Sequence, residues 1–352
     1  MKRLKHMPGD ERFKRIYGAF LGLAFGDAIS FAALFHRTHQ FPERRREFIW
    51  RTNRDLMRQR IIHLTLPFTH RLAPETLEPF PTDDTEYAIF TAQTLLSTSS
   101  PTAATFLAAW RDRVLPVADL VLTGFSERAA IENIKRGLTP PMSGNDNPQH
   151  YNDSAVARAV AVGAYYSGDA ESAAQVAALE AQVTNAEDGI YAAQAMAAAI
   201  ALISSGHDLI ESLKIARTFF PKNSWIANGN RISLECLQEA ESAQDLLLLL
   251  TTRLINTVYS YGNASPETVP AAFAIVEVCR GDLQQAVMLA NAIPKSADSL
   301  PAMVGALCGA HQGADVMSAK WKAQLNECRG LCLPFVKGAC LDEVAKQIAD
   351  RK

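Results

Sequence analysis

The sequence predicts an all-α fold in one compact domain. Apolar residues recur at helical spacing along most of the chain, and the alternating patterns of strands are scarce. Alanine is concentrated between residues 155 and 201, where small side chains allow helices to approach closely. No Pro/Gly/Ser-rich linker and no repeat of fixed period divides the 352 residues, of which 48% are hydrophobic. Such a chain can bury a substantial core.

Helix starts and stops delimit the predicted elements. Ser100-Pro101-Thr102 places an N-cap and a first-turn proline ahead of a helix through Leu115, with Ser100 as the expected cap. Ser265-Pro266-Glu267 repeats this pattern ahead of a helix through about Cys279. The remaining predicted helices span 154–166, 171–183, 187–204, 208–219, 234–255 and 283–292, and the stretch 234–255 forms one helix or two. The clearest loop, 140–152, is rich in turn formers, so we expect ligand contacts there.

Composition gives the broad class of the protein. The chain has 35 basic and 37 acidic residues, so its total charge of −2 predicts neither a nucleic-acid nor a membrane partner. An Arg-rich stretch, residues 37–60, meets phosphates or forms a solvated helix face. Acidic residues interrupt the signal-peptide-like N-terminus, no CxxC pair occurs among six cysteines, and no apolar run spans a membrane. We therefore expect a cytoplasmic protein.

The turn Thr82-Asp83-Asp84-Thr85 is the strongest local signal of chemistry. One interpretation is structural, with Thr82 capping a helix whose first turn carries acidic residues. The other is a divalent cation site, since adjacent carboxylate and hydroxyl oxygens suit Mg²⁺ or Mn²⁺. The local pattern leaves both open.

Four polar stations near predicted helix ends, taken in order, resemble the ADP-ribosylglycohydrolase family between about residues 15 and 321. The stations are Gly26-Asp27-Ala28, Thr82-Asp83-Asp84-Thr85, Tyr151-Asn152-Asp153-Ser154 and Ser296-Ala297-Asp298-Ser299. The apolar opening that ends in Gly26-Asp27-Ala28 and the closing Gly305-Ala306-Leu307-Cys308-Gly309-Ala310 also look like the family's ends. The resemblance implies a single orthogonal multi-helix domain.

The resemblance also implies an activity and a set of site residues. The implied reaction is Mg²⁺- or Mn²⁺-dependent removal of ADP-ribose, or a related N-ribosyl group, from a modified protein side chain or small molecule. One or two ions orient the ribose while a carboxylate deprotonates the attacking water. The implied metal ligands are Thr82, Asp83, Asp84, Asp298 and Ser299, the catalytic residues Asp83, Asp84 and Asp153, and the ligand-binding residues Tyr151, Asn152, Ser154, Tyr261 and Gly262.

Several positions depart from the family pattern. Ser296 stands where a carboxylate is expected, and Lys295 replaces a glycine, so its ammonium either points inward as a fixed cation or lies on the surface. No acidic residue occurs at 28–35, and Asn185 replaces a histidine. A missing catalytic carboxylate is then supplied by Asp146 or Asp153. The alternative function is a catalytically impaired ADP-ribose-binding protein that acts as a sensor, inhibitor or scaffold.

The expected domain layout follows the extent of the resemblance. Residues 1–14 form an N-terminal extension, 15–325 the helical domain with an Arg-rich insertion at about 36–62, and 326–352 a C-terminal helical segment packed on the same domain. Asp27, at the end of an apolar run, is expected to have a structural role near the site. The sequence does not decide the oligomeric state, the bond that is cut or the kind of residue modified.

Overall fold

The computed structural model describes residues 9–37, 79–255, 263–293, 295–296 and 299–351, and in residues 31–37 only the backbone. Within these ranges the chain is helical and contains no β-strand, so the predicted all-α class is confirmed. Two isolated antiparallel bridges, Asn152 with Ala264 and Glu327 with Cys340, are the β-type contacts of the described part. The Arg-rich stretch from residue 38 to 60 lies outside the described residues.

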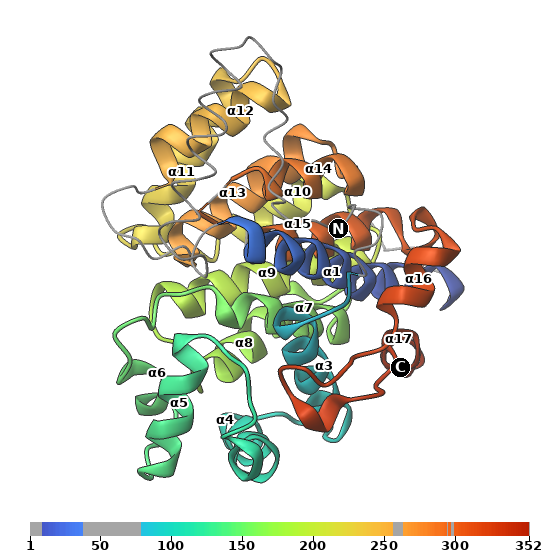
Figure 1. Cartoon of the computed structure of the whole chain (residues 1–352). Coiled ribbons are helices and arrows are strands. Elements are labelled where there is room, and N and C mark those ends of the chain that lie inside the picture. The colour runs from blue at the N-terminus through green and yellow to red at the C-terminus, as the bar shows by residue number, and fades with distance from the viewer. Residues whose placement is uncertain (1–8, 38–78, 256–262, 294, 297–298, 352) are drawn as a thin grey trace.

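The described helices are shown in chain order in Figure 1. In chain order they are α1 (Gly9–Arg37), α3 (Asp83–Leu96), α4 (Ala103–Ala109), α5 (Phe125–Lys135), α6 (Met142–Asn145), α7 (Ser154–Tyr165), α8 (Ala170–Ala181), α9 (Asp188–Ser204), α10 (Leu209–Arg217), α11 (Trp225–Glu239), α12 (Ala243–Leu249), α13 (Ser265–Val278), α14 (Leu283–Asn291), α15 (Leu300–Gln312), α16 (Ala319–Leu325) and α17 (Leu341–Ala349). Short π-helical turns, Trp110–Val114 and Leu250–Leu254, continue α4 and α12.

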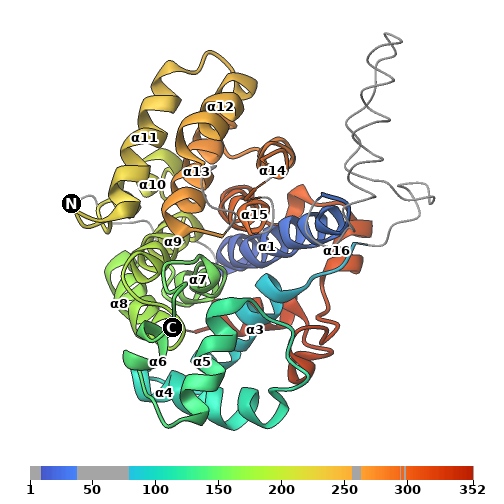
Figure 2. The ribbon, with the colours of Figure 1, turned by 60° about the vertical axis from the view of Figure 1, so that its left-hand side comes forward.

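Helices α1 and α15 lie at the centre of the molecule. In Figures 1 and 2, α11–α14 lie on one side of this pair and α3–α6 on the other. Helices α7 and α9 lie between these two groups. Glycines allow the two central helices to touch through their backbones: a Cβ on Gly22 would lie 1.9 Å from the carbonyl oxygen of Gly305, and one on Gly309 2.0 Å from that of Gly18. The small residues that open and close the predicted domain therefore pack against each other.

Most predicted helices are present, with three differences in detail. Thr102, not Ser100, caps α4, because its hydroxyl accepts the amide of Thr105 in a capping box. The stretch 234–255 contains parts of two helices, and the first of them, α11, begins nine residues earlier at Trp225, where the Ser224 hydroxyl accepts the amide of Ala227. The predicted loop 140–152 contains one helical turn, α6.

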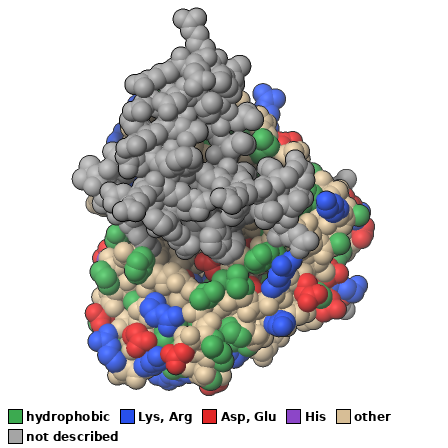
Figure 3. Space-filling view, in the orientation of Figure 1, with side chains coloured by type: hydrophobic (Ala, Val, Ile, Leu, Met, Phe, Trp, Pro, Cys, Tyr) green, Lys and Arg blue, Asp and Glu red, His purple; other side chains and the backbone are tan. Residues whose placement is uncertain are grey.

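The surface mixes the two signs of charge. On the face shown in Figure 3, acidic and basic side chains are interspersed over the described surface, in keeping with a near-neutral chain. No helix in the described ranges has both the length and the apolar character needed to cross a bilayer. All six cysteines are free, and five of them are buried. α1 begins inside the expected N-terminal extension, whose boundary stays a prediction.

Candidate functional site

The turn Thr82-Asp83-Asp84-Thr85 lies at the start of α3, as predicted. Asp83 and Asp84 are half-buried in the first turn of the helix, whereas Thr82 and Thr85 are buried. Thr82 occupies the N-cap position, but its side chain makes no capping hydrogen bond, so the predicted capping role of its hydroxyl is wrong. That hydroxyl donates to Asp27 on α1 instead.

Asp27 fixes this turn from 55 residues away. Its Oδ2 accepts the amides of Thr82 (2.8 Å) and Thr85 (3.1 Å) and the hydroxyl of Thr85 (2.6 Å), while Oδ1 accepts the Thr82 hydroxyl. Asp27 is thus the hydrogen-bond acceptor for amides at the start of α3 that have no partner within the helix. Its near-complete burial raises the pKa of Asp27 to about 6, although the hydrogen bonds from both threonines oppose the rise. The expected structural role of Asp27 is confirmed.

The start of α15 lies close to the same end of the structure. Gly26, beside Asp27, is in backbone contact with Pro301: a Cβ on Gly26 would lie 2.0 Å from the Pro301 carbonyl oxygen. Ser299 is the residue before α15, and its hydroxyl lies 3.3 Å from Oδ1 of Asp153, which precedes α7 and is 1% exposed. Two predicted site residues, 146 positions apart in the sequence, therefore meet.

The loop at residues 150–154, called the ligand loop below, is paired with the start of α13. Asn152 forms the isolated bridge with Ala264, the amide of Ser265 donates to the carbonyl of Tyr151 (3.1 Å), and the amide of Asp153 donates to that of Asn263 (2.9 Å). The starts of α7, α13 and α15 are thereby linked to one another through Asp153 and these backbone bonds, and the start of α3 is bonded to Asp27 on α1, which contacts α15 at Gly26. Helix N-termini carry partial positive charge, which favours the carboxylates gathered at this end of the fold.

Tyr151 presents an aromatic face beside this junction. Its ring lies 5.3 Å from that of Trp225, the first residue of α11, and the imidazole of His150 packs edge-on against it at 5.6 Å. Trp225 is 38% exposed. Sequence reasoning missed Trp225, because the predicted helix started too late to place it near the loop.

The side chain of Lys295 points into the structure. Its Nζ lies 3.2 Å from Oε2 of Glu267, and the two side chains are 17% and 2% exposed. The inward alternative for Lys295 is therefore the observed one. The sequence analysis did not single out Glu267, which lies in the first turn of α13, three residues after Ala264, the bridge partner of Asn152. Ser296 is 1% exposed, and its hydroxyl makes no hydrogen bond to the described residues.

Two acidic residues were offered for the missing carboxylate, and the structure separates them. Asp146 lies on the surface, where its carboxylate pairs with Arg136 at 3.0 Å and its side chain is 55% exposed. Asp153 is buried beside Ser299. His150 Nε2 lies 3.5 Å from the exposed carboxylate of Glu187.

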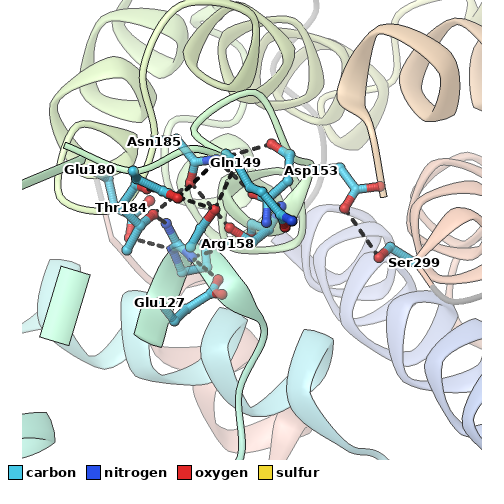
Figure 4. A network of polar contacts seen from close by, with 12 residues as sticks. Glu127, Gln149, Asp153, Arg158, Glu180, Thr184, Asn185 and Ser299 are labelled. Atoms are coloured by element: carbon cyan, nitrogen blue, oxygen red, sulfur yellow. Dashed lines mark hydrogen bonds and ion pairs between the residues drawn. The ribbon is translucent and has the colours of Figure 1, made fainter. Parts of the chain in front are cut away.

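Asn185, which stands at the family's histidine position, holds the ligand loop. Its Nδ2 donates to Oδ1 of Asn152 (2.8 Å), to the Asn152 carbonyl (3.0 Å) and to the His150 carbonyl (3.1 Å). Its Oδ1 accepts the Ser154 hydroxyl at 3.1 Å. Asn152 and Ser154, which the sequence predicts to bind the ligand, are thus fixed by one amide, in the network drawn in Figure 4.

Three predicted site residues, Tyr261, Gly262 and Asp298, lie outside the described residues. Among the residues that are described, no three His, Cys, Asp or Glu side chains gather closely enough to hold a metal ion by themselves. The described candidates Thr82, Asp83, Asp84 and Ser299 offer only oxygen donors. This donor chemistry fits Mg²⁺ or Mn²⁺ and does not fit a thiolate- or imidazole-bound metal.

The comparisons with known proteins agree with this fold. No curated protein sequence matches the chain. A solved structure described as an ADP-ribosylglycohydrolase-related protein complex is similar in fold, with a TM-score of 0.60 and 20% identity over 97% of this chain and 98% of that chain. The sequence profile of the ADP-ribosylglycohydrolases matches residues 8–352, nearly the whole length. The chain therefore belongs to the ADP-ribosylglycohydrolase family.

Proposed function

We propose that this protein is a divalent-metal-dependent glycohydrolase that releases ADP-ribose, or a related N-ribosyl group, from a modified side chain or small molecule. Family membership supports a hydrolase in general. The observation that carries the finer proposal is the contact of Ser299 with the buried carboxylate of Asp153. It brings a proposed metal ligand and a proposed base together where the starts of α7, α13 and α15 meet.

The metal-binding part of the proposal uses the oxygens of both turns. Thr82, Asp83, Asp84, Asp298 and Ser299 would hold one or two ions of Mg²⁺ or Mn²⁺. The Thr82 hydroxyl donates its proton to Asp27, so its oxygen keeps lone pairs for a cation. When bound, such an ion supplies positive charge that orients the ribose hydroxyls and the attacking water.

The chemical step is assigned to residues of this chain. Asp153 accepts a proton from water while the water oxygen bonds to the anomeric carbon and the bond to the leaving group breaks. Tyr151, Asn152, Ser154, Tyr261 and Gly262 would bind the ADP-ribose, with Tyr151 and Trp225 as an aromatic surface next to it. Asp83 and Asp84 would act through the metal site.

Two substitutions test this assignment against a matched control. Asp83→Ala and Asp153→Asn should abolish release of ADP-ribose from arginine- or serine-linked ADP-ribosyl proteins, whereas Asp146→Asn should leave release unchanged. Asp146 is the control because it is the same residue type in the same loop region, but pairs with Arg136 on the surface. Retained turnover in Asp83→Ala, or in the presence of a chelator, would refute the proposal.

A second function is favoured by the Lys295–Glu267 ion pair. A fixed ammonium beside a turn that has lost a carboxylate to Ser296 supplies positive charge without a metal. This favours an ADP-ribose-binding protein without turnover, acting as a sensor, inhibitor or scaffold. Calorimetry with ADP-ribose, paired with the hydrolysis assay over a range of Mg²⁺ and Mn²⁺ concentrations, separates the two functions: binding without turnover at any concentration supports the second.

A further inference from the structure

A buried ion cluster lies directly behind the ligand loop (Figure 4). The Arg158 side chain on α7 is fully buried, and its guanidinium pairs with Glu180 on α8 (2.7 Å) and Glu127 on α5 (3.0 Å). Both carboxylates are almost inaccessible to water as well. Charges buried this completely persist only when they are paired and hydrogen-bonded, so the cluster is a rigid reference point for the groups it touches.

Arg158 reaches the residues of the loop both directly, by donating from Nη1 to the Ser154 carbonyl (3.2 Å), and through a series of hydrogen bonds that begins at Thr184. A guanidinium can only donate, so Arg158 Nη2 donates to the Thr184 hydroxyl oxygen. The Thr184 proton is then available for Oδ1 of Asn185, 2.6 Å away. Because Oδ1 of Asn185 accepts, its Nδ2 must face the carbonyl and side-chain oxygens of Asn152. Arg158 thus sets the orientation of the Asn185 amide through Thr184.

The turn that carries Thr184 and Asn185 is shaped to receive the loop. The amide of Ala186 donates to the His150 carbonyl at 3.1 Å. A Cβ on Gly189 would lie 2.5 Å from the same carbonyl oxygen, so a larger residue could not be placed there without displacing the loop. Glu187, between them, has a φ of 47°, a conformation that non-glycine residues adopt mainly where surrounding contacts enforce it.

The fixed amide decides where Asp153 lies. Asn152 and Ser154, on either side of Asp153, both bond to the Asn185 side chain. The carboxylate of Asp153 faces Ser299 only while its two neighbours keep this register. Rotation of the Asn185 amide would place its oxygen against the carbonyl oxygens of His150 and Asn152, which can only accept, and would break these two bonds.

We propose that Thr184 and Asn185 are positioning residues. Through their hydrogen bonds, the buried Arg158 cluster fixes the conformation of the ligand loop, residues 150–154. The functional part of this inference rests on the proposed function, because it takes the loop to bind ADP-ribose. The structural part does not. Neither residue needs to touch the substrate for this role.

The test compares three threonine variants. Thr184→Val removes the relay hydroxyl, and Thr184→Ser restores it. Thr91→Val is the matched control, because Thr91 is also buried and its hydroxyl bonds Glu180, a different member of the same cluster. Valine at either position removes one hydroxyl from one ion cluster, so a purely structural role predicts the same outcome for both.

Two measurements on each variant test the relay, and a third compares the stability of the two valine variants. Amide hydrogen exchange of the peptides covering 150–154 should be faster in Thr184→Val, and unchanged in Thr184→Ser and Thr91→Val. Calorimetric affinity for ADP-ribose should fall roughly 10- to 100-fold in Thr184→Val alone, the range expected when groups behind a site lose their orientation. Unfolding in urea shows whether the two valine variants are destabilised alike.

Each outcome decides one of the two proposals. Equal effects of Thr184→Val and Thr91→Val on exchange and affinity, or failure of Thr184→Ser to restore them, would overturn the relay. If the wild-type protein binds no ADP-ribose while exchange at 150–154 still responds to Thr184→Val alone, the proposed function fails and the relay stands.

Discussion

The carboxylate of Asp27 on α1 accepts both the amide and the hydroxyl of Thr85 on α3, at 3.1 and 2.6 Å. Together with the two bonds from Thr82, this gives the turn Thr82-Asp83-Asp84-Thr85 a hydrogen-bond acceptor that belongs to another helix. The direction in which Asp83 and Asp84 point therefore depends on how α1 packs against α3.

Asp27→Asn tests this dependence. An amide offers one acceptor oxygen in place of two and turns donors toward the threonine donors, so we expect a loss of about 1–3 kcal/mol in the free energy of unfolding. Affinity for Mn²⁺ should fall as well, because the turn is no longer held. Asp10→Asn on the same helix is the control, since Asp10 is exposed and pairs only with Lys14 at the surface in the described structure. Urea unfolding that is unchanged in Asp27→Asn would contradict the prediction.

Lys295→Gln tests the role of the internal ammonium. Removing the ammonium leaves the buried carboxylate of Glu267 without its cation, and the more negative surroundings of the second turn should tighten the binding of Mn²⁺ by roughly tenfold. Calorimetric titration with Mn²⁺ gives both the affinity and the number of ions for each chain. Lys214→Gln, which removes an exposed lysine paired with Glu211, should change neither. Equal Mn²⁺ affinities for the wild type and Lys295→Gln would show that the ammonium does not act on the metal site.

Gly22→Ala tests the contact between α1 and α15. The added methyl would lie 1.9 Å from the Gly305 carbonyl oxygen, and this backbone atom cannot rotate away. We expect destabilisation of about 1–3 kcal/mol or more, despite the better helix propensity of alanine. Gly9→Ala, where a Cβ would meet nothing within 4 Å, serves as the control. Thermal and urea unfolding measure both variants, and wild-type stability in Gly22→Ala would mean that the helices separate at little cost.

His311 near the end of α15 should make stability depend on pH. Burial, and then the charge of Arg15, lower the pKa of His311 below its ordinary value of 6.5. The folded state therefore resists protonation that the unfolded chain accepts. The contribution of His311 to the free energy of unfolding should be constant above pH 6.5. It should fall as the pH drops from 6.5 toward the lowered pKa of His311 in the folded state. In His311→Gln this component of the slope should disappear, which urea unfolding at a series of pH values would detect; an unchanged slope would assign it to other groups.

The local patterns of the sequence predicted most of the helices and the place of the acidic turn. Helix starts depend on nearby residues, so prolines, capping residues and apolar spacing were enough to indicate α3, α7 and α13 within a residue or two. The start of α11 was missed, although Ser224 is its N-cap residue and a local signal of the helix start. The capping role of Thr82 was wrong because the side chain has a better acceptor elsewhere, in Asp27.

The candidate site was predictable as a set of residue types and not as a set of contacts. The resemblance pointed to Asp153 and Ser299 separately, and their contact joins positions 146 apart. The same is true of the inward turn of Lys295 toward Glu267 and of the surface position of Asp146. The local sequence was compatible with an inward or an outward Lys295, and with either Asp146 or Asp153 as the site carboxylate.

The sequence by itself determined that the chain is all-α, which turns carry oxygen donors, and which family pattern they follow, because these properties depend on residue type and spacing within a few turns. Tertiary structure alone decided that Asp27 holds the acidic turn, that Lys295 is an internal cation, and that Arg158 orients the ligand loop through Thr184 and Asn185. Buried polar groups must find partners, and the partner that is available is fixed by how distant helices pack.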